Sequence, residues 1–215
     1  GVKYRKTCLH CHEAPDLRFE TERVWLDQVK EARGNDEDPI EITWKPFSLQ
    51  QVNQKNGPEY KAWDEADADL DGSLWGLRAG VAAKRQGEAA MRRYLPLVLR
   101  AKHEGREDLG DKSLLTDLAE QAGLNLSQFE KDLGDRTTLD EIAASHKEGV
   151  EERGVFGTPT FVFENGASAF LKLIRPKTPQ DAERAFDSLI DVMQREVFVG
   201  ELKRPQPPWP KGIFD

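Results

Sequence analysis

The 215-residue sequence is poor in sulfur, with two cysteines and two methionines. Two cysteines allow at most one disulfide, so the hydrophobic core has to hold the fold without a network of cross-links. No run approaches 18 consecutive apolar residues, and we therefore expect no transmembrane helix. Positively charged residues are also fewer than negatively charged ones, because the sequence has 31 Lys and Arg and 39 Asp and Glu. The net charge is therefore −8. This balance argues against nucleic acid and membrane surfaces as partners.

The first residues, Gly1 to Tyr4, contain no charged segment followed by an apolar stretch, so we expect no signal peptide. The expected location is the cytoplasm. A processed or truncated chain would look the same, and an extracytoplasmic location stays open on that ground. The length and a hydrophobic content of 38% suit one domain, or one domain that carries a large insertion.

Both cysteines lie in one short motif, CLHCH, at residues 8–12. The spacing C-x-x-C suits a dithiol–disulfide cycle, metal binding or, with His12, attachment of a c-type haem. A structural zinc site normally takes its ligands from two separated pairs, and the sequence has no second pair. No other histidine or methionine stands in a recognisable haem-ligand context. The motif therefore favours the dithiol cycle, with haem attachment as a minor alternative.

Hydrophobic periodicity predicts a strand, a helix and a second strand in the N-terminal third. Val2–Lys6 is the expected first strand, and apolar residues at helical spacing predict a helix over His12–Ala32. Ile40, Ile42 and Trp44 then alternate with polar residues, which is typical of a half-buried strand.

The segment from about residue 58 to residue 149 is rich in helix formers. A helix over Ser73–Lys102 is expected to break or bend at Pro96, because proline lacks the amide donor that the helix requires. Further helices are expected over residues 111–121, 127–133 and 137–153. This region is predicted to be a helical block without internal repeats.

Two β-prone runs joined by Asn-Gly at 165–166 predict an antiparallel hairpin over Thr160–Ile174. Thr178 is then the expected cap of a helix that ends at Gly200, and its apolar stripe predicts packing on a sheet or another helix. The element order is therefore β-α-β, a helical block, and α-β-β-α. Removal of the block leaves the connectivity of a thioredoxin-type domain.

A second motif, GVFGTPTFVF at residues 154–163, places a proline at the start of a predicted strand. At this position the missing amide donor does not interrupt the sheet. An X-Pro bond adopts the cis form at a cost of about 0.5–1 kcal/mol. A cis bond between Thr158 and Pro159 would turn the Thr158 backbone outward, where its N–H and C=O could pair with an extended substrate.

An acidic segment, Asp64–Asp71, contains part of the spacing of a calcium-binding EF-hand loop. Counted from Asp67, the twelfth position is Arg78, where such a loop needs a bidentate glutamate. We therefore predict a solvated acidic segment and no calcium site.

Four features together resemble the DsbA-like branch of the thioredoxin superfamily. They are CLHC near the N-terminus, GVFGTPTFVF, the helical block before it, and KPFSLQQVN after the second strand. The arrangement is similar to the cytosolic FrnE-like and 2-hydroxychromene-2-carboxylate isomerase-like members, and it extends to about Gly200. It implies an α/β, thioredoxin-like fold with a large helical insertion between the second strand and the cis-proline loop.

This resemblance also implies a division of the chain. Residues 1–55 and 136–200 are expected to form the two parts of the thioredoxin-like domain, and residues 56–135 the helical insertion. Residues 201–215 are expected to be a proline-rich tail.

The resemblance further implies a thiol–disulfide oxidoreductase, with Cys8 as nucleophile at the start of the first helix and Cys11 as resolving residue. The helix N-terminus and His10 would stabilise the Cys8 thiolate, the form that attacks a disulfide. Thr158 and Pro159 would bind the substrate backbone. The expected substrates are proteins or small thiols that carry a thiol or disulfide. No cofactor is implied beyond a low-molecular-weight thiol as electron partner.

An alternative keeps the fold and changes the chemistry. Glutathione-type isomerases and transferases of this fold use a bound thiol and do not cycle a disulfide. The presence of both Cys8 and Cys11 favours dithiol chemistry. A scaffold that only binds its partner is the remaining class, and it predicts that loss of Cys8 changes no activity.

Overall fold

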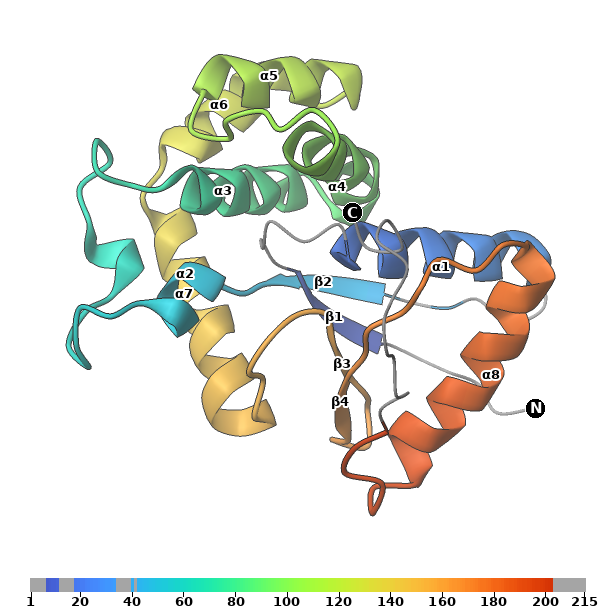
Figure 1. Ribbon diagram of the computed structural model, residues 1–215. Coiled ribbons are helices and arrows are strands. Elements are labelled where there is room, and N and C mark those ends of the chain that lie inside the picture. The colour runs from blue at the N-terminus through green and yellow to red at the C-terminus, as the bar shows by residue number, and fades with distance from the viewer. Residues whose placement is uncertain (1–6, 12–17, 34–39, 41, 203–215) are drawn as a thin grey trace. The chain divides into compact units, whose positions relative to one another are not determined.

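The computed structural model describes residues 7–11, 18–33, 40 and 42–202 (Figure 1). Its strands are β1 (Thr7–Cys11), β2 (Ile42–Pro46), β3 (Thr160–Val162) and β4 (Ser168–Phe170). Its helices are α1 (Arg18–Arg33), α2 (Leu49–Asn53), α3 (Gly72–Arg85), α4 (Glu88–His103), α5 (Lys112–Gln121), α6 (Leu126–Gly134), α7 (Thr137–Lys147) and α8 (Pro179–Arg195), with a 3-10 turn η1 (Ala62–Asp64) and a π-helical turn η2 (Glu148–Glu152). The α/β class and the predicted helical insertion are confirmed. None of the described helices is both long and apolar enough to span a membrane.

The chain folds into two units. Among the described residues, the sheet unit contains 7–10, 18–33, 40, 42–44 and 153–202, and the helical unit contains 11 and 45–152. The sheet unit thus combines segments from both ends of the chain, as the thioredoxin-type connectivity requires.

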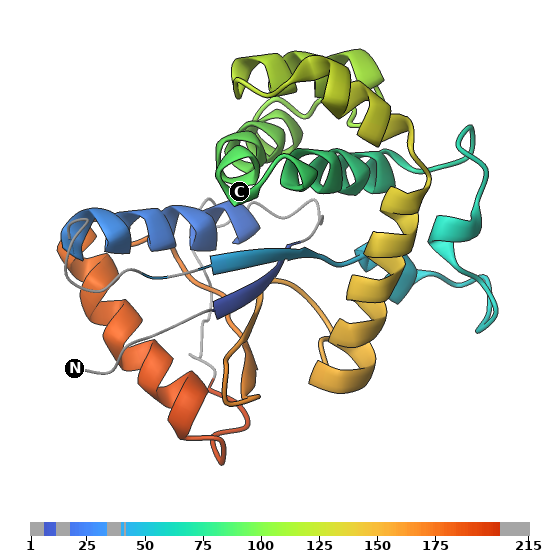
Figure 2. The same ribbon diagram turned by 180° about the vertical axis from the view of Figure 1, so that it is seen from behind.

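The sheet has the strand order β2-β1-β3-β4. Strand β1 runs antiparallel to β3, with Cys8 opposite Val162 and His10 opposite Thr160. Strand β3 in turn pairs antiparallel with β4, and Thr160 lies opposite Phe170. Figure 2 shows β1 beside β2 from behind. The first and third strands are therefore neighbours although about 150 residues separate them.

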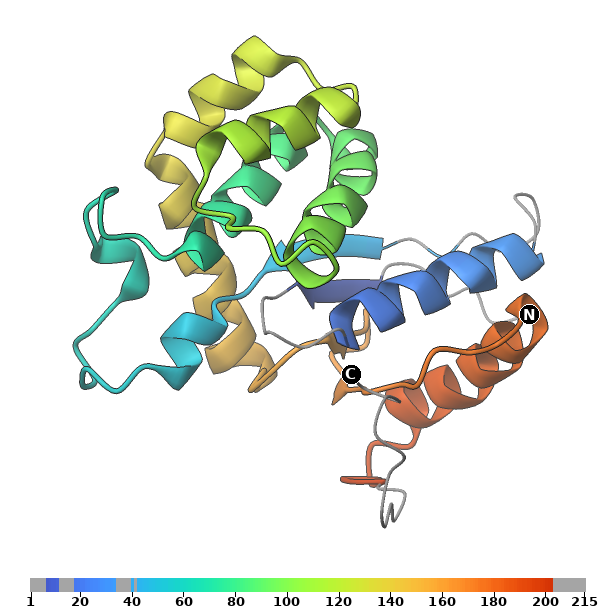
Figure 3. The same ribbon diagram turned by 45° about the horizontal axis from the view of Figure 1, so that its top comes forward.

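An aromatic cluster forms the core of the sheet unit. Helices α1 and α8 pack against each other beside the sheet (Figure 3). Trp25 of α1 is fully buried and donates its indole N–H to the carbonyl of Ala182 at 2.9 Å. The Trp25 ring lies 6.2 Å from Phe161 and 5.5 Å from Phe186, measured between centroids. One side chain therefore joins β3, α1 and α8.

Local signals define the hairpin and the last helix as predicted. Gly166, in the turn between β3 and β4, has a φ of 85°, which glycine adopts without a steric penalty. The Thr178 hydroxyl accepts a hydrogen bond from the amide of Asp181 at 3.1 Å and caps α8. The helix ends at Arg195, so the prediction of an end at Gly200 is wrong. Val197 and Phe198, beyond this end, are exposed.

Helix α3 is central in the helical unit, where it packs against α4, α5, α6 and α7. Tyr94 of α4 is buried and donates its hydroxyl to the carbonyl of Leu115 at 3.1 Å. Its ring lies 5.3 Å from that of Phe129, and burial raises the pKa of the phenol. A buried tyrosine with a satisfied hydroxyl thus connects three helices of this unit.

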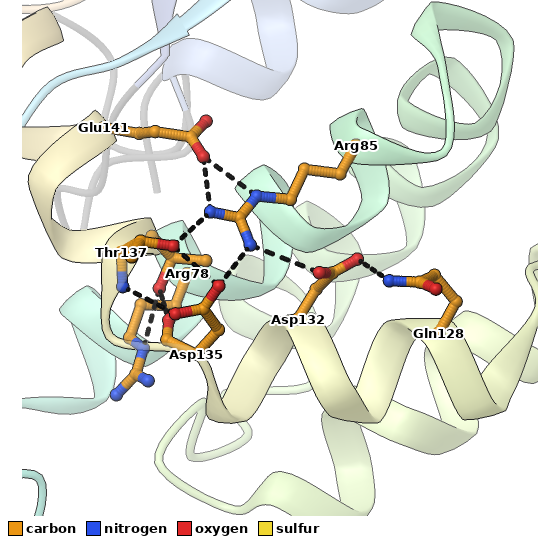
Figure 4. A network of polar contacts seen from close by, with 8 residues as sticks. Arg78, Arg85, Gln128, Asp132, Asp135, Thr137 and Glu141 are labelled. Atoms are coloured by element: carbon orange, nitrogen blue, oxygen red, sulfur yellow. Dashed lines mark hydrogen bonds and ion pairs between the residues drawn. The ribbon is translucent and has the colours of Figure 1, made fainter.

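Arg85 forms a second connection in the helical unit (Figure 4). Its guanidinium contacts Asp132 at 3.2 Å, Asp135 at 2.9 Å and Glu141 at 2.6 Å. The Thr137 hydroxyl and amide bond to Asp135, and with Arg85 they lower the pKa of that carboxyl to about 2. The C-terminal end of α3 is therefore joined to the α6–α7 connection by charged groups.

The acidic segment has a structural role at Asp67. The fully buried Arg78 donates to Asp67 at 3.1 Å and to the Thr138 hydroxyl at 3.1 Å. Its guanidinium also lies 4.2 Å from the centroid of Trp75. Arg136 binds the same Asp67 carboxylate. The arginine that stands in place of a calcium ligand is thus the partner of Asp67.

The long helix predicted over Ser73–Lys102 is two helices, and its break does not lie at Pro96. Helix α3 ends before Gly87, whose φ of 106° is in the region that favours glycine. Pro96 lies inside α4, which continues to His103. The sequence rule failed because a proline removes one helical hydrogen bond, and packing of the α4 apolar face can offset that loss.

Candidate functional site

The CLHC motif lies in strand β1, not at the start of a helix. The predicted strand Val2–Lys6 and residues 12–17 fall outside the described residues, and α1 begins at Arg18 among those described. The prediction that Cys8 occupies a first helical turn is therefore wrong. The stabilisation of its thiolate expected from a helix N-terminus does not apply to a strand position. Tertiary pairing with β3 extends the strand through the motif, and local sequence gives no sign of that pairing.

The motif nevertheless lies beside the strand that follows Pro159. The antiparallel register places Cys8 opposite Val162, Leu9 opposite Phe161 and His10 opposite Thr160. Because the two strands are antiparallel, the C-terminal end of β1 lies beside the start of β3, which Pro159 directly precedes. The strand that contains the motif is thus paired with the strand that follows Pro159.

The strand conformation sets a condition on a Cys8–Cys11 disulfide. A β-strand rises by about 3.3 Å per residue, so three steps separate two Cα atoms by roughly 10 Å. A disulfide needs Cα atoms no more than about 7 Å apart. A bridge between Cys8 and Cys11 therefore requires the end of β1 to leave the extended conformation.

The second predicted site element is the loop before β3, where the Thr158–Pro159 peptide bond is cis. Pro159 is buried and Thr158 is half-buried. The neighbouring carbonyls are occupied, because Gly157 accepts from the Thr160 hydroxyl at 2.7 Å and Pro159 accepts from the Leu171 amide at 3.2 Å. The N–H and C=O of Thr158, by contrast, have no hydrogen-bond partner within the described part of the chain.

A cluster that the sequence did not predict lies in the helical unit, where His146 is surrounded by Ser48, Phe47 and Trp63. The Ser48 amide donates to His146 Nδ1 at 3.2 Å, and the imidazole stacks on Phe47 with centroids 4.5 Å apart. The Trp63 ring lies 5.3 Å away. Burial, with a smaller contribution from the charge of Lys61, lowers the pKa of His146 to about 4. At neutral pH the ring is therefore neutral, with Nδ1 as acceptor.

This cluster holds the KPFS segment against α7 and η2. The Ser145 hydroxyl donates to the carbonyl of Pro46 at 2.7 Å, and Lys45 Nζ lies 2.6 Å from Glu148 Oε1. The signal in the sequence was KPFSLQQVN, which suggested a family but no partner for its residues. In the described part of the chain, no three histidine, cysteine, aspartate or glutamate side chains gather where they could hold a metal ion.

Residues 24–182 match the model of the DSBA-like thioredoxin domain family. The matched range includes Thr158 and Pro159 and begins after Cys11. The family signal therefore does not depend on the CLHC motif.

Three proteins illustrate what the chain is similar to. The uncharacterized protein Rv2286c of Mycobacterium tuberculosis is 27% identical over 86% of this chain and 76% of its own. A 2-hydroxychromene-2-carboxylate isomerase structure gives a TM-score of 0.56 at 15% identity, covering 91% of this chain and all of its own. The cytosolic disulfide reductase DsbM of Pseudomonas aeruginosa, solved with GSH, gives 0.52 at 13% identity, over 86% of this chain and 98% of its own. The two structures support the same fold.

Proposed function

The chain belongs to the DSBA-like thioredoxin domain family, and from this premise we propose that it is a thiol–disulfide oxidoreductase that uses Cys8 and Cys11. One observation carries the proposal. The strand with both cysteines pairs with the strand that directly follows the cis Thr158–Pro159 bond. A substrate bound to the Thr158 backbone would therefore be held next to the motif.

The reaction in the reducing direction has two exchanges. The Cys8 thiolate attacks one sulfur of the substrate disulfide, the substrate S–S bond breaks, and the departing sulfur leaves as a thiolate that takes up a proton. The Cys11 thiolate then attacks Cys8 Sγ in the mixed disulfide and releases the second substrate sulfur. The substrate gains two electrons and two protons, and the two cysteines become a disulfide. The oxidising direction is the reverse.

In the second exchange, Cys11 can reach Cys8 only if the end of β1 leaves the extended conformation. Where β1 stays extended, a low-molecular-weight thiol can attack the mixed disulfide in place of Cys11. It releases the substrate as a thiol and leaves a small mixed disulfide on Cys8, which a second small thiol then reduces. Both routes start at Cys8, and they differ in whether Cys11 is needed.

The remaining roles follow from position. His10 lies two residues from Cys8 on β1 and opposite Thr160, so a positive charge on its ring would favour the thiolate. The N–H and C=O of Thr158 would pair with an extended substrate, and Pro159 would hold that backbone in place. Protein disulfides and small-molecule disulfides are both proposed substrates.

The test is reduction of insulin by dithiothreitol in the presence of the protein, with Cys8→Ser, Cys11→Ser and the double variant as a matched set. We expect Cys8→Ser and the double variant to fall to the uncatalysed rate. Cys11→Ser should accumulate mixed disulfides or, with a small thiol added, keep turnover. Normal turnover by Cys8→Ser would contradict the mechanism.

One observation favours a second candidate, a glutathione-type isomerase or transferase. The family match covers residues 24–182 and leaves out both cysteines. In this case the double serine variant would keep a glutathione-dependent activity, because a bound thiol and not a protein thiol would react. The same set of variants therefore separates the two candidates.

A further inference from the structure

The sequence contains two Asn-Gly dipeptides, Asn56-Gly57 in the helical unit and Asn165-Gly166 in the sheet unit. All four residues are exposed, and the two glycines have φ values of 100° and 85°. An asparagine before glycine is prone to ring closure, because glycine has no side chain to hinder attack of its amide nitrogen on the asparagine side chain. The same chemistry is open to both dipeptides, so their hydrogen bonds decide where it occurs.

At Asn165 the three groups that take part in ring closure are all hydrogen-bonded. Its side-chain Nδ2 donates to the carbonyl of Gln194 at 2.8 Å, and its Oδ1 accepts from the amide of Ala167 at 3.1 Å. The attacking nitrogen, the Gly166 amide, donates to the carbonyl of Phe163 at 2.9 Å. These bonds have to break before the ring can close, and the fold therefore protects Asn165.

The Asn56-Gly57 dipeptide lacks this protection. Within the described part of the chain, no hydrogen-bond partner is found for the Asn56 side chain or the Gly57 amide, and no heavy atom lies within 4 Å of a Cβ built at Gly57. Gln54 Oε1 accepts from the Asn56 amide at 2.6 Å, and Gln54 Nε2 donates to the Gly57 carbonyl at 3.0 Å. Gln54 thus holds the dipeptide on both sides and leaves the attacking nitrogen unbonded.

We propose that Asn56 is a site of spontaneous modification, where water converts the asparagine to aspartate or isoaspartate. The Gly57 amide nitrogen attacks Asn56 Cγ and forms a C–N bond. The Cγ–Nδ2 bond breaks, and Nδ2 leaves as ammonia with the proton that the amide gives up. Water then opens the cyclic imide at either of its two carbonyl carbons. One water is consumed and one ammonia released, and no other reactant takes part.

Both products place a negative charge where Asn56 is neutral, and the isoaspartyl product also lengthens the main chain by one methylene. The distance between the Asn56 amide and the Gly57 carbonyl then changes, so Gln54 cannot keep both of its bonds. The Gly57 carbonyl also accepts from the Tyr60 amide at 3.2 Å. Loss of these contacts should open the loop between α2 and η1 to proteolysis, since exposed loops without backbone contacts are preferred cleavage sites.

The test follows both dipeptides in the intact chain, kept at mildly alkaline pH, by proteolysis and mass spectrometry. We expect Asn56 to convert at least about tenfold faster than Asn165, because breaking the three hydrogen bonds at the hairpin turn slows ring closure by at least that factor. In concentrated urea the two rates should become alike. Equal rates in the folded protein, faster conversion of Asn165, or no conversion of Asn56 would overturn the inference. A difference that persists in urea would also overturn it, because neighbouring residues and not the fold would then set the rates.

A second readout is radiolabelling of isoaspartyl carboxyls by a protein isoaspartyl methyltransferase, with Asn56→Ser and Asn165→Ser as a matched pair. Aged wild type and aged Asn165→Ser should be labelled alike, and Asn56→Ser should lose the label. Loss of the label in Asn165→Ser with retention in Asn56→Ser would contradict the assignment. This inference does not involve Cys8 or Cys11, so its outcome is independent of the proposed function.

Discussion

The two units are stabilised by different means. In the sheet unit, one buried indole contacts a strand residue and a helix residue, and the charged group beside this cluster, the Arg33 guanidinium, lies 4.9 Å from the Phe186 centroid. In the helical unit, arginines on α3 bind carboxylates and hydroxyls from other segments. An apolar core tolerates little change in volume, whereas a charged network depends on the geometry of each partner. The unit with the apolar core is also the one that carries the cis-proline loop.

Trp25 should be the most sensitive position. Trp25→Ala removes the contacts to Phe161 and Phe186 and should lower the free energy of unfolding by about 3–5 kcal/mol. Trp25→Phe keeps a ring and loses the hydrogen bond to Ala182, and should cost about 1–2 kcal/mol. Urea denaturation gives both values. A loss below about 1 kcal/mol for Trp25→Ala would show that this cluster is not the centre of the unit.

Arg78 provides the corresponding test in the helical unit. Arg78→Met keeps much of the side-chain volume and removes the bonds to Asp67 and Thr138, which should cost about 2 kcal/mol. Arg136→Met is the control, because Arg136 binds the same carboxylate from an exposed position and should cost less than about 1 kcal/mol. If Arg78→Met and Arg136→Met lost the same free energy of unfolding, the buried arginine would contribute no more to stability than the exposed one, which would contradict this account.

His146 predicts a pH dependence that belongs to the helical unit. Its pKa in the folded protein, about 4, lies below the ordinary value of 6.5. Between pH 6.5 and pH 4 the imidazole of His146 is protonated in the unfolded chain and neutral in the folded protein. The free energy of unfolding therefore falls as the pH decreases from 6.5 toward 4. A difference of one in pKa corresponds to about 1.4 kcal/mol, so the loss of stability over this range should be roughly 3 kcal/mol. His146→Gln should flatten this part of the profile measured by urea denaturation, and an unchanged slope would contradict the assignment.

Arg85 should give a smaller effect than Arg78, because two of its three carboxylate partners, Asp135 and Glu141, are exposed. Arg85→Ala should cost about 1 kcal/mol, and Arg85→Lys, which cannot form the same forked contacts, should recover only part of it. Added salt should shrink the difference between wild type and Arg85→Ala. A difference in thermal unfolding that does not change with salt would mean that packing, not charge, accounts for this position.

Sequence alone predicted those features whose causes are local. The Asn-Gly turn, the Thr178 cap and the proline at the start of β3 depend on residues a few positions apart. The sequence also predicted the fold, because the order of elements implies the thioredoxin connectivity. Pro96 was misjudged, since whether a helix survives a proline depends on packing against distant segments.

The site was predicted in part for the same reason. Thr158 and Pro159 form a recognisable local motif, and the cis bond is present. The strand position of CLHC depends on pairing with β3, about 150 residues away. His146 has no local signal, because a buried histidine is identified only by its neighbours in space.

The most direct test of the proposed chemistry is to trap its covalent intermediate. Cys11→Ser protein, incubated with a disulfide-linked peptide and then alkylated, should carry one peptide bonded to Cys8, located by proteolysis and mass spectrometry. The double serine variant should carry none. Absence of any adduct on Cys8, with catalysis retained, would contradict the claim that this motif exchanges disulfides beside the cis-proline loop.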